Sequence, residues 1–570
     1  MCANRIVRSV LAMPVLLAVL FALTVFAVAG EAGEKEVRDV MLRIADKDVA
    51  VRRAALDELA RTRDARLAQF LEAYRQGSLH LFNGELVFCE QTVRDDQGAK
   101  QAPLFDPLTR EPLLRSGVQI VVPARVIQDV SPKRRERKLV GDAILRLNLW
   151  SPDPEKRLAA VHRCGDFRRA EFLTLLDEVL TLESVDQVRQ TTRESIWLIR
   201  LAGDVPDQSR EARFSAARGL GEMRSFRALS IFEELLADIQ KTAEKGETAD
   251  AELTQTYQEA VERIENYQRF VRGFEYLFSG LSLGSVLILM ALGLSIIFGL
   301  MGVINMAHGE LMMIGAYATY ETQQLFVEHL PQTAFNWYYV AALPAAFLSA
   351  ALVGYLIEIL VVRYLYGRPL ETLLATWGVS LILIQAIRLR YGDNIAVNNP
   401  TWLRGGAEIM QDVIVPYNRC FIIVLCIFCV LLIHCLMRYT KTGLLVRATM
   451  QNREMADGLG VNTRRIDGYT FALGAGIAGI AGYALTLIGG VTPDMGQNYI
   501  VDSFLVVVTG GVGELAGVIW SGLGIGLLNK FLEPTSGAVW GKILILICVV
   551  FFIQWRPAGL FPPKGRLADV

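Results

Sequence analysis

The feature that most constrains this chain is a succession of long apolar runs that begins after Phe274. An apolar run of about 18 residues or more can cross the roughly 30 Å hydrocarbon core of a membrane as a helix. The sequence contains nine apolar segments. An odd number is needed if the chain enters the first segment from outside the cytoplasm and leaves the last one inside it, which is what the basic residues and the N-terminus indicate. The sequence therefore predicts an all-α polytopic membrane protein. The segments lie near 276–299, 303–325, 338–362, 372–391, 419–437, 466–489, 500–513, 516–531 and 539–555.

Basic residues distinguish the two sides of the predicted membrane. Lysine and arginine are enriched in cytoplasmic loops, and here they gather at 363–368, 438–465 and 556–566. We therefore place these three regions in the cytoplasm and the intervening loops outside it. The segments at 500–513 and 516–531 are short and glycine-rich, which is typical of broken or re-entrant helices. The odd count holds whether both of them cross or neither does.

The N-terminus has the pattern of a secretory signal peptide. Arg5 and Arg8 are followed by the apolar run 10–28, and a small-x-small triplet closes the pattern at 27–29. A basic start, an apolar centre and small residues at the end are the marks of such a peptide. An uncleaved membrane anchor is the alternative. Either interpretation places residues 31–270 outside the cytoplasm, in the periplasm.

A spacing of arginine, alanine and a further apolar residue recurs three times in this extracytoplasmic part. Residues three and four apart share one face of a helix, so each copy must bury that face against a neighbour. We predict HEAT-like helical pairs, interrupted by a small β-containing insertion at 79–130, where Asn83-Gly84 is a hairpin signal. The three copies are Arg52-Ala55-Leu59, Arg157-Ala160-Cys164 and Arg213-Ala216-Leu220.

Charge separates the parts of the chain. The extracytoplasmic part is dense in Arg, Asp and Glu, whereas the apolar part has few charges. The formal net charge of −1 leaves no basic excess to neutralise phosphates, which argues against a nucleic-acid-binding protein. We expect a signal peptide at 1–29, a mostly helical periplasmic domain at 30–240, a polar connector helix at 241–274 and a transmembrane domain at 275–565.

Cysteine usage does not indicate a metal or redox centre. Five of the eight cysteines lie in apolar membrane segments, where the side chain usually serves as a small hydrophobe. Cys426 and Cys429 have C-x-x-C spacing, but no other soft ligands accompany them. Cys89 and Cys164 lie in the predicted oxidising compartment, and whether they form a disulfide stays open. We expect neither a metal nor a cofactor.

Two strings resemble enzyme motifs, and their context argues against each. Residues 280–284 match G-x-S-x-G, but they open a membrane segment instead of a strand-to-helix elbow. Residues 537–542 resemble a phosphate-binding loop, but they lack one spacer residue and the Ser or Thr that should follow Lys542. We therefore predict that the chain is not an enzyme and carries no ATPase of its own.

The cytoplasmic stretch 440–462 is long for a loop of this chain. Its apolar residues predict a short amphipathic helix outside the bilayer, and such a helix can offer its apolar side to a groove on a partner. We expect Ala456 and Leu459 to insert into that groove, with Gly443 and Gly460 as the helix breakers. A solvated basic loop is the alternative. The candidate docking residues are Gly443, Arg447, Ala448, Met455, Ala456, Leu459 and Gly460.

Several strings resemble the branched-chain amino acid (LivH-like) permease family of ABC importers. The stretch 440–462 is similar to that family's coupling loop, which docks on the ATPase; 302–310 resembles its first-span signature and 551–562 its C-terminal one. The resemblance covers about 275–565. Within the family, the strings at 368–378, 399–402 and 490–499 are most similar to the urea-importer (UrtB-type) permeases, which often carry a long N-terminal extension.

The resemblance implies a transmembrane permease subunit of an ATP-driven importer for a small neutral or zwitterionic solute, with urea favoured. It implies a second permease subunit, two ABC ATPase subunits, a periplasmic solute-binding protein and membrane lipid as partners. The implied location is the bacterial inner membrane, with a cytoplasmic C-terminus. Branched-chain amino acids or short amides are the alternative substrates. A membrane-anchored sensor, whose N-terminal domain binds a ligand or partner, is the alternative of another class.

Polar residues inside the apolar segments are functional candidates because their desolvation is costly. No continuous relay of Asp, Glu and His crosses the segments, which disfavours an ion-coupled carrier. The string Gly-Glu-Leu recurs at 309–311 and 513–515, beside two glycine-rich breaks, and hints at two related halves. Two interpretations stay open for these polar residues: they line a path or gate, or they break and pack helices. The candidate path or gate residues are Asn305, His308, Glu310 and Glu514.

Overall fold

The computed structural model divides into two compact units between Gln268 and Arg269. The predicted signal peptide at 1–29 lies outside the residues that the structure describes. Those residues are 35–90, 93–94, 100–115, 118–202, 209–244, 250–410 and 413–561.

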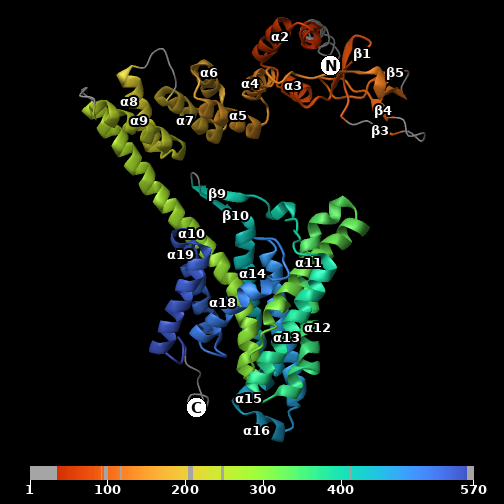
Figure 1. Ribbon diagram of the computed structural model, residues 1–570, viewed down its shortest axis with the longest axis vertical. Coiled ribbons are helices and arrows are strands. Elements are labelled where there is room, and N and C mark those ends of the chain that lie inside the picture. The colour runs from red at the N-terminus through yellow and green to blue at the C-terminus, as the bar shows by residue number, and fades with distance from the viewer. Residues whose placement is uncertain are drawn as a thin grey trace, which may run out of the picture. The chain divides into compact units, whose positions relative to one another are not determined.

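The first unit is mostly helical, as the sequence predicts (Figure 1). Their apolar faces form three cores, one around α2–α4, one around α5–α7 and one that α7–α9 share with the start of α10. The helices are α2 (Val49–Arg61), α3 (Arg66–Gln76), α4 (Arg137–Asn148), α5 (Pro154–Phe167), α6 (Leu173–Leu182), α7 (Asp186–Ala202), α8 (Arg210–Met223), α9 (Phe226–Glu244) and α10 (Ala251–Met301), with 3-10 turns at Arg43–Ala45, Ala124–Val126 and Ala170–Phe172.

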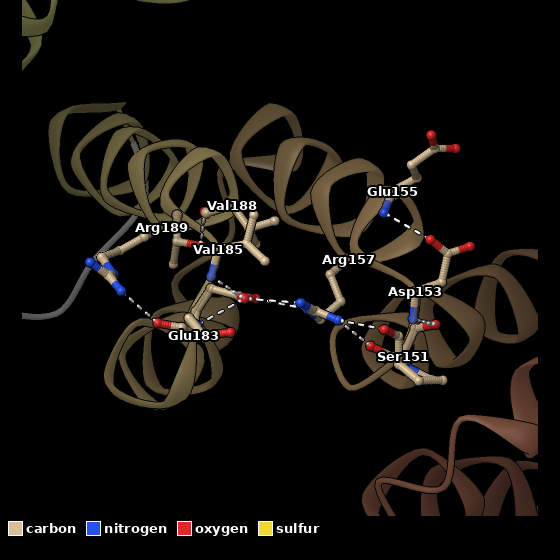
Figure 2. Close-up of polar contacts among 11 residues, drawn as sticks. Ser151, Asp153, Glu155, Arg157, Glu183, Val185, Val188 and Arg189 are labelled. Carbon is tan, nitrogen blue, oxygen red and sulfur yellow. Dashed lines mark hydrogen bonds and ion pairs between the residues drawn. The ribbon is translucent and has the colours of Figure 1, made fainter.

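The recurring arginine performs the same task in two of its three copies. Arg157 on α5 donates to the carbonyl oxygens of Ser151 (2.7 Å) and Pro152 (3.1 Å), six and five residues before it, and to the Glu183 carboxylate (2.7 and 2.9 Å; Figure 2). Each arginine thereby ties the start of its own helix to a carboxylate from a later element, which explains the spacing seen in the sequence.

The matching copy is Arg52 on α2. It donates to the carbonyl oxygens of Asp46 (2.7 Å) and Lys47 (3.0 Å), at the same offsets, and to the Glu136 carboxylate (2.5 Å). Asp48 and Asp153, four residues before the two arginines, cap the two helices through their side chains. In the third copy Ser209 caps α8, four residues before Arg213.

The β-containing insertion at 79–130 is confirmed. β1 (Leu79–Phe82) and β2 (Glu85–Phe88) form the expected hairpin, and Asn83 and Gly84 adopt the positive φ values (52° and 84°) that its tight turn requires. β8 pairs with the other edge of β1, giving the order β2-β1-β8, and β3, β4 and β7 form a second sheet in that order. The remaining strands are β3 (Val93–Arg94), β4 (Lys100–Pro103), β5 (Leu114–Arg115), β6 (Val118–Gln119), β7 (Val121–Pro123) and β8 (Gln128–Val130).

The second unit is a helical bundle (Figure 1). Among the described residues, six helices are long and apolar enough to span a membrane: part of α10, α12, α13, α14, α17 and the first part of α19. The elements are α11 (His308–His329), a 3-10 helix at Gln332–Trp337, α12 (Tyr338–Leu360), a 3-10 turn at Val362–Leu365, α13 (Pro369–Tyr391), a 3-10 turn at Thr401–Leu403, β9 (Gly406–Met410), β10 (Val413–Pro416), α14 (Tyr417–Tyr439), α15 (Lys441–Gln451), α16 (Arg453–Gly458), α17 (Thr463–Leu485), α18 (Met495–Gly510) and α19 (Leu515–Trp555).

Glycines set the close packing at the centre of the bundle, where α11, α12 and α17 contact one another. A Cβ atom added at Gly315 would overlap the backbone of Gly479, and one at Gly482 would overlap the carbonyl oxygen of Met312. Side-chain-free contacts of this kind let helix backbones approach closely in membranes. Gly280 and Gly284, the glycines of the enzyme-like string, serve the same purpose against α19.

The structure differs from the predicted all-α membrane part in one place. β9 and β10 form an antiparallel hairpin between α13 and α14, at the end of the bundle opposite to α15 and α16 (Figure 1). Val413 and Val415 are buried while Ile414 between them is exposed, which is the alternation of a strand with one covered face. The predicted break between 531 and 539 lies at Gly537, whose φ of 78° interrupts α19.

Candidate functional site

The predicted docking stretch folds as two short helices, α15 and α16. Thr440 caps α15 by accepting from the backbone N–H of Gly443 (3.1 Å), and Asn452 caps α16 by accepting from that of Met455 (2.9 Å). Gly460, with φ of 86°, ends α16 as expected. Gly443 is not a breaker, because it lies inside α15, where a Cβ atom would overlap the carbonyl oxygens of Leu436 and Met437.

Three apolar side chains are exposed on this pair of helices, among polar and charged ones. Leu459 is 80% exposed and Met455 63% exposed, and Leu444 on α15 adds a third exposed apolar side chain. Arg447 is exposed and Ala448 half-buried. Ala456 on α16, in contrast, is buried, so its predicted place on the exposed side is wrong. Leu459, directly after α16, is the exposed residue of the two.

Met450 connects α15 to two helix breaks of the bundle. Its Cε lies about 3 Å from where a Cβ of Gly299 or Gly513 would stand: 3.0 Å for Gly299 near the end of α10, and 3.3 Å for Gly513 just before α19. Gly513 also donates its N–H to the Ser295 hydroxyl on α10 (3.3 Å). One side chain of α15 thus lies against both breaks.

A second contact fastens α16. Arg453, the first residue of α16, forms an ion pair with Asp467 on α17, whose side chain is fully buried. The Arg453 guanidinium also lies 4.7 Å from the centre of the Tyr366 ring. Removing one partner of a buried ion pair strongly destabilises the folded protein, because the other charge is left buried without a counterion. The docking stretch is thus held to α17 as well as to the breaks.

The four candidate path or gate residues do not form one site. His308 is fully buried and its Nε2 lies 3.1 Å from the Met290 carbonyl oxygen on α10. Glu310, also buried, faces the Ser380 hydroxyl on α13. Two residues apart on a helix means about 200° of rotation, so the two side chains point to opposite neighbours.

Asn305 and Glu514 lie in the two glycine-rich breaks, each just before the helix that follows. The Asn305 side chain is buried and accepts from the N–H of Ala307 (3.0 Å) just before α11 begins. Glu514 is half-buried and precedes the first residue of α19. The recurring Gly-Glu-Leu string therefore marks two helix starts that follow glycine-rich breaks, at 309–311 and 513–515.

Sequence reasoning missed Met450, Arg453 and Asp467. Asp467 carried a usable signal, since it is a lone acidic residue at the edge of a predicted membrane segment, where an ionisable group is a functional candidate by default. Arg453 was counted only among the basic residues of the loop. Met450 carried no signal, because an apolar residue on a short helix does not reveal which glycines it will contact.

The cysteines contribute no centre among the residues that the structure describes. Cys89 and Cys164 are buried in separate cores, and no disulfide joins them. Cys426 and Cys429 lie one turn apart on α14, both buried among apolar side chains. No group of three or more His, Cys, Asp or Glu residues suited to a metal occurs within the described ranges.

Residues 276–553 match the family model described as the branched-chain amino acid transport system / permease component. This part of the chain belongs to that family. The high-affinity branched-chain amino acid transport system permease protein BraD of Pseudomonas aeruginosa is 28% identical over 296 residues, which are 50% of this chain and 94% of the relative. The protein LivH of Escherichia coli is 27% identical over 302 residues, 51% of this chain and 96% of the relative.

A weaker similarity extends to the permease protein LivM of Escherichia coli, which is 24% identical over 305 residues, 49% of this chain and 69% of the relative. No solved structure matches the chain. The predicted membership of the LivH-like permease family is thereby confirmed. Together with the six membrane-capable helices, it identifies a multi-pass inner-membrane transport permease.

Proposed function

We propose that this chain is the transmembrane permease subunit of an ATP-driven ABC importer, and that its solute is a small neutral or zwitterionic molecule, urea first. The observation that carries the proposal is the contact of Met450 with both Gly299 and Gly513. It joins an exposed apolar docking surface, made of Leu444, Met455 and Leu459, to the breaks in the bundle. That is the connection a permease needs if ATP hydrolysis outside the membrane is to open a path within it.

The mechanism is alternating access. A periplasmic solute-binding protein delivers the solute, and two ATPase subunits close on ATP, one on this chain and one on a second permease subunit. The ATPase moves α15 and α16, Met450 pushes on the junction of α10 and α19, and the Arg453–Asp467 ion pair moves α17. Both helix starts that carry the Gly-Glu-Leu string shift with these elements.

Nine crossings complete the proposed topology. Helices occupy all nine predicted segments, and α11, α18 and Val539–Trp555 would cross alongside the six membrane-capable helices. The first unit then lies in the periplasm after a signal peptide, as a HEAT-like helical scaffold. Labelling of single cysteines should place residues 200 and 405 outside and residue 450 inside. Labelling of residues 200 and 450 from the same side would contradict this topology.

Transport assays separate the substrate alternatives. A strain that lacks the chain should regain uptake of labelled urea when the chain is restored, with weaker uptake of acetamide and none of leucine. Preferential leucine uptake would favour the substrate named for the relatives. Normal transport after deletion of residues 31–240, with the signal segment retained, would exclude the sensor alternative. Loss of solute-dependent signalling without any transport would favour that alternative.

Two substitutions test the docking surface and the connection separately. Burial of a leucine contributes about 1.5–3 kcal/mol, so Leu459→Asp should weaken ATPase co-purification at least about tenfold. Glu454→Ala, on an exposed position of α16, is the control. Met450→Ala leaves the docking surface intact, so the ATPase should still co-purify and hydrolyse ATP while uptake per ATP falls. Normal uptake by both variants would show that the stretch 440–462 is only a solvated connector.

A further inference from the structure

Buried polar atoms without a hydrogen-bond partner gather on one short stretch of the second unit. Among the described residues, five such atoms belong to the stretch 305–317: Asn305 Nδ2, His308 Nδ1, both carboxylate oxygens of Glu310, and the hydroxyl of Tyr317. A buried polar group left unpaired costs about 1–3 kcal/mol. His308 points toward α10, so Glu310 and Tyr317, which lie against α13, are the two that could bind a further polar group together.

Two of these residues face the same neighbour. Glu310 and Tyr317 are seven residues apart, which places them on one face of α11 about 10 Å apart along the helix. Both are nearly fully buried, with 1% and 2% of their surface exposed. Glu310 faces Ser380 on α13, and the Tyr317 ring lies 4.9 Å from that of Tyr391 at the end of α13.

α13 presents a matching row of hydroxyl groups. Thr372, Thr376 and Ser380 recur at four-residue spacing, and all three are buried. The Thr376 hydroxyl accepts from the N–H of Met306, just before α11 (3.1 Å). Thr372 donates its hydroxyl to the carbonyl oxygens of Leu365 and Arg368, so Thr376 and Ser380 are the members of this row that contact the start of α11, at Met306 and Glu310.

The arginine nearest to the Tyr317 end of the boundary between α11 and α13 has its own partners. Arg388, near the end of α13, is already paired with Asp494 (2.8 Å) and Asp393 (3.0 Å). Within the described ranges, no lysine or arginine forms an ion pair with Glu310. A solute that carries a carboxylate would thus meet no compensating cation beside Glu310.

We infer that Glu310, Ser380 and Tyr317 form a binding site for the transported solute, and that this solute is a small neutral molecule with several N–H donors, of the amide or urea class. The inference rests on the proposed permease function. Glu310 accepts two N–H bonds from the solute, while Ser380 and Tyr317 complete its hydrogen bonding along the helix face. A branched-chain amino acid could pair its ammonium group with Glu310, but its carboxylate would meet no cation there, since Arg388 is already paired with Asp393 and Asp494.

The test uses the complete transporter, with its ATPases and binding protein, in proteoliposomes. Glu310→Gln and Tyr317→Phe are compared with two matched controls on α11, Glu328→Gln at an exposed position and Tyr320→Phe one turn away. Uptake of labelled urea, acetamide and leucine is measured, together with ATPase co-purification. Both site variants should raise the KM for urea and acetamide and lower uptake at limiting solute about tenfold or more, while the controls transport normally.

The possible results distinguish a wrong solute class or a wrong binding site from a wrong permease function. Wild-type transport of leucine in preference to urea and acetamide would overturn the solute class while leaving the permease function intact. Unchanged KM values in both site variants would overturn the site. Should Glu310→Gln not assemble, Tyr317→Phe, which removes a single oxygen, decides alone. A wild-type complex that binds no ATPase and transports none of the three solutes would instead overturn the permease function itself.

Discussion

The two units hold their helices together by different means. In the first unit, Arg52 and Arg157 each satisfy backbone carbonyls and a carboxylate, so buried charge serves as a fastener between helices. In the second, glycines such as Gly315 and Gly482 bring helix backbones into direct contact. There the buried carboxylate of Glu310 has no such fastening task.

This difference teaches which polar residues belong to the scaffold. A buried charge with every partner supplied by its own chain stabilises one arrangement and is costly to disturb. A buried carboxylate without partners lowers stability and is retained for another reason, such as contact with a solute. Substitutions that remove the partner of Glu183 and those that remove Glu310 should therefore shift stability in opposite directions, and the predictions below run from the largest effect to the smallest.

Gly482→Ala should have the largest effect. The added methyl group would overlap the Met312 carbonyl oxygen and displace α17 from α11, and overpacking typically costs about 1–3 kcal/mol, with so close an overlap at the upper end of that range. Gly524→Ala on α19 is the matched control, because no atom lies near its added Cβ. The yield and the melting temperature of the detergent-solubilised protein check the prediction. Equal behaviour of the two variants would show that backbone contact does not fasten this bundle.

Arg157→Ala should follow. It leaves the Glu183 carboxylate, whose side chain is 3% exposed, with its backbone donors alone and frees the carbonyls of Ser151 and Pro152. We expect a loss of about 2 kcal/mol, read as faster hydrogen exchange across α5–α7 in the full chain. Arg163→Ala, an exposed arginine of the same helix, should change little. Exchange that is unaltered in both variants would mean that the arginine is not a fastener.

The sequence predicted what local chemistry decides. The apolar runs located the helices, and Asn83-Gly84 located a hairpin, because a tight turn demands residues that accept positive φ. The β9–β10 hairpin was missed because two short strands between long apolar runs read as loop. The orientation of α16 was also missed, since a six-residue helix is too short for its pattern to choose between Ala456 and Leu459 as the exposed residue.

The candidate site was predictable only residue by residue. Asn305, His308 and Glu310 were chosen as a group because they are neighbours in sequence, but helix rotation sends His308 to α10 and Glu310 to α13. Grouping them with Ser380 or Tyr317 required knowing which helices are neighbours in space. The same holds for Met450 and its two glycines.

Glu310→Met should shift stability in the opposite direction. Methionine fills a similar volume and removes an unpaired buried carboxylate, so the membrane unit should gain about 1 kcal/mol while uptake is lost. Glu328→Met, at an exposed position of α11, should leave both quantities unchanged. The melting temperature and solute uptake of the same preparations check this. A clear loss of stability in Glu310→Met would mean that Glu310 helps to hold the helices together, as Glu183 does in the first unit.

The smallest effect should depend on pH. The two Arg157 hydrogen bonds hold the pKa of Glu183 below its usual range, and burial opposes them only in part. The N–H groups of Ser184 and Val185 add to the lowering. A carboxyl whose pKa is lowered by folding stabilises the folded state above its ordinary pKa, and that contribution is lost as pH falls through the folded pKa. Glu183→Gln should therefore weaken α5–α7 at neutral pH by less than Arg157→Ala does.

The deficit should disappear as the solution is made acidic, because the unaltered Glu183 then carries a proton as well. Hydrogen exchange of α5–α7, taken as a ratio to the unaltered chain at each pH, measures this without the intrinsic pH dependence of exchange. Glu234→Gln, at an exposed position of α9, should give a ratio near one throughout. A Glu183→Gln deficit that is constant with pH would mean that the shape of the side chain holds the helices together, and that charge does not.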